Sequence, residues 1–78
     1  MISIIIAEDQ YMLRKAMVQL IEFNEQMKVV NDCNNGGDAF EFIEKYHPDI
    51  AILDIEMPGL TGLEVLSKIR EFKIDTKV

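Results

Sequence analysis

The feature that most constrains this chain is a short aliphatic run, Ile50-Ala51-Ile52-Leu53, which ends directly on a carboxylate, Asp54. Consecutive apolar residues without alternation are typical of a strand that is covered on both faces of a parallel sheet. A charged side chain is not buried with such a strand unless it is paired or hydrogen-bonded. We therefore expect Asp54 to lie at the carboxyl edge of a sheet, where water or a cation can reach it.

The rest of the chain predicts a regular alternation of strands and helices. Apolar and β-branched runs predict strands at residues 2–7, 28–33 and 49–54, and the beginning of a fourth strand at 74–78. Helical spacing of apolar residues predicts helices at about 11–23, 38–46 and 62–72. This order predicts an α/β fold, a doubly wound parallel sheet with right-handed crossovers and helices on both faces.

Two local patterns predict the inward face of the first helix and a turn before the second. In the first helix, the spacing predicts that Arg14 and Lys15 face solvent and that the inward face consists of Leu13, Ala16, Met17, Leu20 and Ile21. The Asn-Asn-Gly-Gly sequence at 34–37 predicts a turn, because Gly and Asn tolerate positive φ.

Composition excludes several classes of function. The chain has 78 residues and a net charge of −6, which argues against nucleic-acid binding by this segment. Its one cysteine, Cys33, permits no intrachain disulfide and is expected to be a packed side chain. We find no signal peptide and no apolar run long enough to span a bilayer, so we expect a cytoplasmic location and no membrane partner.

Acidic residues follow two of the predicted strands. Glu8-Asp9 comes directly after the first strand, and Asp54 ends the third. If the first strand lies between the second and the third, these three carboxylates share one pocket at the carboxyl edge of the sheet. Their repulsion would favour a shared cation, and carboxylates are the ligands that Mg²⁺ prefers.

A carboxylate beside bound Mg²⁺ can attack a phosphoryl group and form an aspartyl-phosphate. On this interpretation Asp54 is the nucleophile and also a metal ligand. Asp9 binds the metal directly, and Glu8 acts through a water molecule.

Structural explanations of the same residues stay open at this point. Asp9 can serve as the N-cap of the first helix, and Asp54 can cap a turn, because Asp is favoured at such positions. The sequence Gly36-Gly37-Asp38-Ala39-Phe40 is superficially similar to the diguanylate cyclase motif, but it opens a predicted helix. His47 has no second histidine nearby and is expected to face solvent. We find no phosphate-binding loop and no calcium-binding loop.

Taken together, the chain resembles the receiver domain of two-component response regulators, from residue 1 to its end. The motifs that carry the resemblance are Glu8-Asp9, the run Asp54-x-x-Met57-Pro58-x-x-x-Gly62, and Asn35-Gly36-x-Asp38-Ala39. Within that family, residues 6–10 and 54–64 are similar to regulators with a LuxR-type helix-turn-helix output domain, including the desaturase or membrane-fluidity regulators of Gram-positive bacteria.

The resemblance implies a flavodoxin-like fold with strand order 2-1-3-4-5. It also implies phosphoryl transfer from the phosphohistidine of a sensor histidine kinase to Asp54. Mg²⁺ would be bound by Asp9, Asp54 and the backbone carbonyl of Glu56, with Glu8 acting through water, and Met57 and Pro58 would shape the loop over the site. Control of transcription would pass through a DNA-binding output domain outside this chain.

The family pattern also bears on the length of the chain. Residues 1–78 would be a partial receiver domain, truncated after the third helix at the start of the fourth strand. The Ser or Thr and the Lys that contact the phosphoryl group in this family would then lie beyond residue 78. The third strand would be an exposed apolar edge, which predicts a homo-oligomer or a domain swap.

Two other functions compete with this interpretation. The chain could be an interaction or assembly unit whose acidic pocket is unused. It could also be a Mg²⁺-dependent phosphatase with an Asp nucleophile, but Glu56 and Met57 occupy the positions where that class has a second Asp and a small residue. We therefore expect a signalling component rather than a turnover enzyme.

Overall fold

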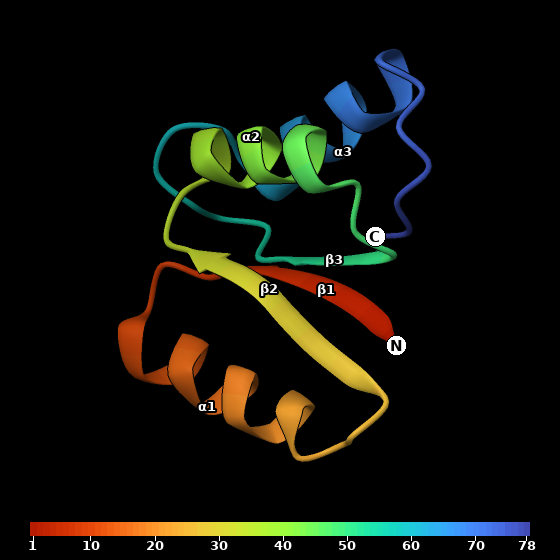
Figure 1. Ribbon diagram of the computed structural model, residues 1–78. Helices are drawn as coiled ribbons and strands as arrows, with labels where there is room; N and C mark the ends of the chain where they lie inside the picture. Colours follow the sequence, from red (N-terminus) through yellow and green to blue (C-terminus); the bar gives the residue numbers. More distant parts are fainter.

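The computed structural model describes all residues, 1–78, and its elements alternate in the predicted order (Figure 1). The strands form a parallel sheet in the order β2-β1-β3. Figure 1 shows α1 on one face of this sheet and α2 and α3 on the other. The predicted doubly wound arrangement is therefore confirmed, with β1 in the middle. The elements are β1 (Ile2–Ala7), α1 (Tyr11–Glu22), β2 (Met27–Cys33), α2 (Gly36–Tyr46), β3 (Ile50–Leu53) and α3 (Gly62–Glu71).

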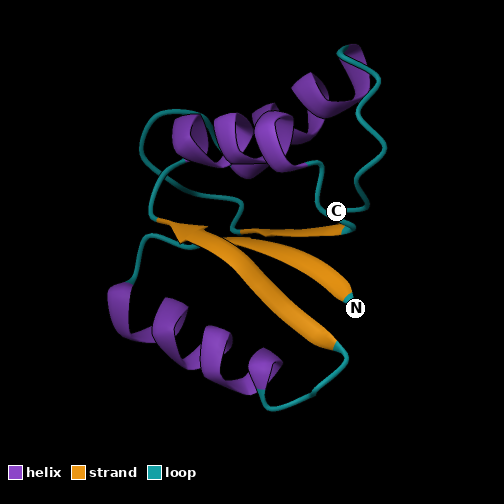
Figure 2. Ribbon diagram, viewed as in Figure 1, coloured by secondary structure: helices purple, strands orange, loops and turns teal.

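The main core lies between the sheet and the layer formed by α2 and α3 (Figure 2). Ile5 of β1, Ile43 of α2 and Ile69 of α3 are completely buried there. Because complete burial of one aliphatic side chain contributes about 1.5–3 kcal/mol, this layer supplies much of the stability of the domain. The carboxyl edge of the sheet, where Asp54 follows β3, is thus supported by a packed layer of helices on this face.

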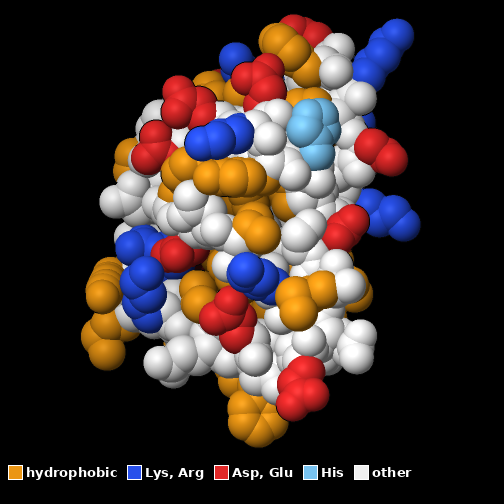
Figure 3. All heavy atoms as spheres, viewed as in Figure 1, with side chains coloured by type: hydrophobic (Ala, Val, Ile, Leu, Met, Phe, Trp, Pro, Cys, Tyr) orange, Lys and Arg blue, Asp and Glu red, His pale blue; other side chains and the backbone are white.

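The inward face of α1 differs from the prediction. Leu13 and Leu20 were expected to face inward but are 46% and 76% exposed. Ala16, also expected inward, is exposed, whereas Met17 and Ile21 are half-buried as predicted. The other half-buried positions of α1 are Arg14 and Val18, and none of its residues is fully buried. Apolar residues occupy so many positions of this helix that their spacing did not determine which face packs. Figure 3 accordingly shows apolar side chains exposed at the lower end of the molecule, where α1 lies.

The explanation of the Asn-Asn-Gly-Gly sequence was also wrong. Helix α2 begins at Gly36, and the Asn35 side chain caps it by accepting a hydrogen bond from the Asp38 N–H at 2.8 Å. Neither Gly36 nor Gly37 has a positive φ. Gly36 is required because a Cβ at this position would overlap the carbonyl oxygen of Leu60. The backbone of a distant loop therefore packs directly on the first turn of α2.

The segment predicted as the start of a fourth strand lies beside β3, but it forms a single bridge rather than a strand. Ile50 pairs with Lys77 in parallel orientation. The Ala51 N–H donates to the Lys77 carbonyl at 2.7 Å, and the Lys77 N–H donates to the Asp49 carbonyl at 3.1 Å. The second half of β3, Ile52 and Leu53, pairs only with β1. None of the three helices has the length and apolar character needed to cross a membrane.

The close contact at Gly36 gives a testable prediction with a matched control in the adjacent residue. Gly36→Ala should destabilise the fold by about 1–3 kcal/mol, the usual cost of an overpacked site, because the new methyl group meets backbone that cannot rotate away. At Gly37 a Cβ would lie 3.4 Å from Asn35 Oδ1, which is ordinary contact. Gly37→Ala should therefore be neutral or slightly stabilising.

Urea denaturation followed by circular dichroism measures both free energies of unfolding. Equal effects of the two substitutions would show that the contact between Gly36 and Leu60 is not tight.

Candidate functional site

Three acidic residues meet at the carboxyl edge of the sheet. Glu8 and Asp9 follow β1, and Asp54 follows β3, whose parallel pairing with β1 continues in the hydrogen bond from the Asp54 N–H to the Ala7 carbonyl at 3.0 Å. One carboxylate oxygen from each residue lies within 4.8 Å of the others. The structure therefore brings together the three side chains that the sequence predicted to share a pocket.

The three carboxylates differ in their exposure to solvent. Glu8 is buried, with 7% of its surface exposed, whereas Asp54 is half-buried and Asp9 is exposed. The Gln10 N–H, 3.0 Å from Glu8 Oε2, lowers the pKa of Glu8. Burial and the carboxylates of Asp9 and Asp54 outweigh this hydrogen bond, so that the pKa of Glu8 lies above its ordinary value. The pocket thus favours uptake of positive charge, either a proton or a cation.

Asp9 is not the N-cap of α1. That position belongs to Gln10, and no side-chain hydrogen bond caps the helix. The carboxylate of Asp9 instead lines an open cleft of about 540 Å³ beside Asn34, Asn35, Pro58 and Gly59. The interpretation of Asp9 as the N-cap of α1 is thereby excluded. Its side chain is accessible from solvent at the edge of the acidic pocket.

The loop that follows Asp54 is held at both ends. The Gly62 N–H donates to the Ile55 carbonyl at 3.0 Å, and a Cβ on Gly62 would overlap the Asp54 carbonyl oxygen. In the middle of the loop, Met57 is buried, and the Pro58 carbonyl accepts a hydrogen bond from the Gly36 N–H at 3.2 Å. The loop therefore has a defined course next to Asp54.

Two features of this loop bear on the expected roles of its residues. Met57 packs against Ala7, Cys33 and Ala39 and so anchors the loop to the core. Pro58, by contrast, lines the cleft. Glu56 is exposed between these residues and Asp54. The role of its backbone carbonyl as a metal ligand stays a prediction.

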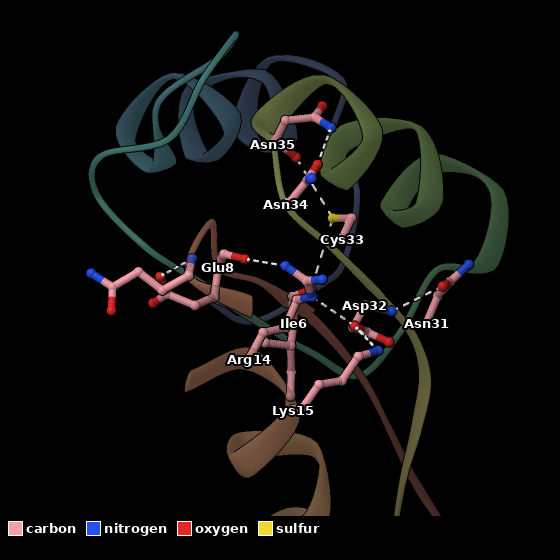
Figure 4. A network of polar contacts seen from close by, with 10 residues as sticks. Ile6, Glu8, Arg14, Lys15, Asn31, Asp32, Cys33, Asn34 and Asn35 are labelled. Atoms are coloured by element: carbon pink, nitrogen blue, oxygen red, sulfur yellow. Dashed lines mark hydrogen bonds and ion pairs between the residues drawn. The ribbon is translucent and has the colours of Figure 1, made fainter. Parts of the chain in front are cut away.

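A polar network between α1, β2 and the turn after β1 lies beside the pocket and was not predicted from the sequence (Figure 4). The Arg14 guanidinium donates from Nε to Asp32 Oδ2 and from an Nη to the Glu8 carbonyl, both at 2.9 Å. Lys15 Nζ lies 3.0 Å from the same oxygen of Asp32. A signal for this network was present, because Asp32 lies between Val29-Val30 and Cys33 near the end of a predicted strand, and a half-buried carboxylate there needs a cation.

Two other residues of the sequence analysis lie where they were expected. Cys33 is buried, and burial raises the pKa of its thiol to about 11, so the side chain is a neutral packing group at physiological pH. His47 is exposed at the end of α2, where it adopts a left-handed conformation with φ 47°. Neither residue belongs to the site.

The donor set fits a divalent cation of the magnesium type. All side chains in the pocket offer carboxylate oxygens, and the adjoining cleft leaves room for water molecules, which Mg²⁺ usually retains. A cation bound among them would offset the mutual repulsion of the carboxylates. No thiolate or imidazole takes part, so the pocket does not resemble a zinc site.

Comparison with known proteins agrees with this geometry. Residues 4–78 match the family model of the response regulator receiver domain. The chain belongs to this family. A solved LuxR-family DNA-binding response regulator from Staphylococcus aureus matches this receiver chain with a TM-score of 0.96 and 55% identity, over 100% of this chain and 65% of that one.

Curated relatives of this receiver chain are larger proteins. The transcriptional regulatory protein DesR of Bacillus subtilis is 48% identical over 71 residues, which are 91% of this chain and 36% of DesR. The nitrate/nitrite response regulator protein NarL of Escherichia coli K12 is 37% identical over 76 residues, 97% of this chain and 35% of NarL. The chain thus spans about a third of the length of these relatives. The expected resemblance to LuxR-type response regulators is confirmed.

The ion pairs of Asp32 predict a pH dependence of stability. Burial raises the pKa of Asp32, but the hydrogen bonds of Lys15 and Arg14 outweigh it and hold this pKa below its ordinary value. Ionised Asp32 therefore stabilises the fold above its unfolded pKa of about 4, and this contribution is lost as the pH falls through the folded pKa. Asp32→Asn should cost about 1 kcal/mol at pH 6 after solvent screening, and less as the pH decreases below about 4.

Chemical denaturation of wild type and variant across this pH range measures the difference. Glu44→Gln, which removes an exposed carboxylate from α2, serves as the control for net charge. A difference between wild type and Asp32→Asn that is independent of pH would contradict the assignment.

Proposed function

We propose that this receiver domain accepts a phosphoryl group on Asp54 from the phosphohistidine of a sensor histidine kinase, with Mg²⁺ as the cofactor. The module would act in a two-component response regulator that controls transcription. The observation that carries the proposal is the convergence of Glu8, Asp9 and Asp54 within 4.8 Å, beside an open cleft, in a chain of the receiver family.

In the proposed reaction, a carboxylate oxygen of Asp54 attacks phosphorus. The new P–O bond forms as the P–N bond to the kinase imidazole breaks, and the leaving nitrogen recovers its electron pair and takes a proton. Asp9, Asp54 and the Glu56 carbonyl would hold Mg²⁺ directly, and Glu8 through water. When bound, Mg²⁺ supplies positive charge that offsets the charge on the phosphoryl oxygens.

The residues of this chain have distinct tasks in the proposal. Asp54 is half-buried and its backbone is paired with Ala7, so its carboxylate approaches the phosphoryl group from a fixed direction. Asp9 lies on the side of the cleft, where a cation arriving with its water ligands can reach it. Glu8 is buried and hydrogen-bonded to Gln10, which keeps its longer side chain at the inner side of the pocket.

Control of transcription would require contact with DNA by a part of the protein outside residues 1–78. The net charge of −6 disfavours DNA binding by this domain itself, whereas the relative from Staphylococcus aureus is a DNA-binding response regulator. We accordingly propose that residues 1–78 are part of a receiver domain and that the protein acts in the bacterial cytoplasm, where a transcriptional regulator meets DNA.

Labelling by a small phosphodonor tests the proposed function. Acetyl phosphate with Mg²⁺ should give a phosphoryl adduct on Asp54, detected by intact mass and peptide mapping. We expect slow labelling, because the phosphoryl-contacting residues that the family resemblance implies lie outside this chain. Asp54→Asn and chelation by EDTA should each abolish the adduct.

Glu56→Gln is the control for this experiment, because it removes a neighbouring exposed carboxylate and keeps the backbone carbonyl. It should still be labelled on Asp54. An adduct on the Asp54→Asn variant would refute the proposed role of Asp54. An adduct that forms equally well without Mg²⁺ would refute the proposed role of the metal.

The open edge of β3 supports a further proposal, that copies of the 78-residue chain associate through this strand. Ile52 and Leu53 are half-buried and unpaired on that side, and an apolar edge is a template for another strand. Size-exclusion chromatography with light scattering should show dimers or larger species. Ile52→Lys should reduce them, and Leu63→Lys on the exposed surface of α3 should not. A monomer at all concentrations would exclude this association.

A further inference from the structure

We propose that Arg14 is a positioning residue for the acidic pocket, because its guanidinium holds the turn that carries Glu8 and Asp9. This inference rests on the proposed function, since the geometry in question is the one that binds the cation. Arg14 itself does not touch the cation or the phosphoryl group in this account. It acts through the backbone of Glu8.

The guanidinium joins three parts of the structure. It belongs to α1, donates from Nε to Asp32 on β2, and donates from an Nη to the Glu8 carbonyl, each at 2.9 Å (Figure 4). The Arg14 backbone N–H also donates to the Gln10 carbonyl at 2.9 Å. The turn between β1 and α1 is thus held at Glu8 by the side chain of Arg14 and at Gln10 by its backbone.

The hydrogen bond to the Glu8 carbonyl fixes the direction of Asp9. The carbonyl of Glu8 and the nitrogen and Cα of Asp9 belong to one planar peptide unit, so they rotate together. On its other side Glu8 is fixed by the hydrogen bond from its N–H to the Cys33 carbonyl at 3.0 Å. With both groups of Glu8 engaged, the Cα of Asp9 has a set position and its carboxylate leaves the backbone toward the pocket.

Arg14 suits this task because of its shape. Its planar, forked guanidinium can satisfy an acceptor on β2 and another on the turn at the same time. Asp32 is the support that keeps the fork in place, since the side chain of Arg14 is only 14% exposed and that of Asp32 only 20%. An ammonium group carries three donors, but they rotate on a flexible stem and do not fix the angle between two acceptors.

Lys15 is the natural comparison, because it binds the same oxygen of Asp32 at 3.0 Å but has no contact with Glu8. Its side chain is 47% exposed. Removal of either residue removes one positive charge near Asp32 and leaves Asp32 with the other as a partner. Only the removal of Arg14 frees the Glu8 carbonyl.

Charge and position have opposite consequences for Mg²⁺ binding. Loss of a positive charge near a cation site strengthens cation binding by electrostatics alone. Loss of a group that orients a ligand weakens metal binding, by about 10- to 100-fold in established sites. The direction of the change in the Mg²⁺ dissociation constant therefore separates the two explanations.

The experiment is an NMR-monitored Mg²⁺ titration of the wild-type chain, Arg14→Met, Arg14→Lys and Lys15→Met, followed at the amides of Asp9 and Asp54. We expect the dissociation constant to rise about tenfold in Arg14→Met. Arg14→Lys should weaken binding as well, although it keeps the charge. Lys15→Met should bind Mg²⁺ as tightly as wild type or more tightly.

The carbonyl carbon resonance of Glu8 in the metal-free protein gives a second readout. It should shift in both Arg14 variants, which lose the guanidinium hydrogen bond, and stay in place in Lys15→Met. Unchanged amide resonances in α2 and α3 show that a variant is folded, and Arg14→Lys provides the test if Arg14→Met does not fold.

Three results would overturn the inference. If wild type binds Mg²⁺ and both Arg14 variants bind it equally well or better, Arg14 does not position the pocket, whereas the proposed function stands. If Lys15→Met weakens binding as much as Arg14→Met, the effect belongs to charge or to general stability. If wild type itself shows no response at Asp9 and Asp54, the proposed function fails and this inference fails with it.

Discussion

The repulsion among three carboxylates at one edge of the sheet is the constraint on which the rest of this structure depends. The strand order β2-β1-β3 brings the ends of β1 and β3 together, so Glu8, Asp9 and Asp54 meet at one edge of the sheet. The hydrogen bond from Gln10 lowers the pKa of Glu8, but burial, reinforced by the carboxylates of Asp9 and Asp54, holds it above its ordinary value. A fold that keeps such a conflict at its surface favours binding of a cation there, and the donor set fits Mg²⁺.

The surrounding structure holds the acidic residues in place from several directions. Gly36 and Gly62 let the loop after Asp54 pack directly on backbone, where a Cβ would collide with carbonyl oxygens. Buried Met57 anchors the same loop between these points. On the other side, Arg14 connects the turn after β1 to Asp32 on β2. These contacts keep the turn after β1 and the loop after β3 from moving apart. The three carboxylates therefore stay close together despite their repulsion.

Much of this could be predicted from the sequence, because the signals are local. The aliphatic run that ends on Asp54 predicted a strand with a carboxylate at the edge of the sheet, although only Ala51 of that strand is fully buried. The alternation of patterns predicted the sheet. Contacts between distant segments could not be predicted in the same way. Gly36 is required because a Cβ there would overlap the carbonyl oxygen of Leu60. The turn preferences of Gly and Asn carry no information about such a contact between distant residues. The predicted inward face of α1 was right at Met17 and Ile21 but wrong at three other positions, because apolar residues surround most of that helix. Arg14 is also half-buried, since it is hydrogen-bonded to Glu8 and Asp32.

The most direct test of the central claim is the free energy of unfolding of wild type and Asp54→Asn, measured in EDTA and in Mg²⁺. Without metal, the variant should be more stable than wild type by about 1 kcal/mol or more, because one of three repelling charges is removed. Mg²⁺ should stabilise wild type and have little effect on the variant. Glu41→Gln, on the exposed surface of α2, controls for net charge and should behave as wild type. A variant that is less stable than wild type in EDTA, and equally stabilised by Mg²⁺, would contradict the account.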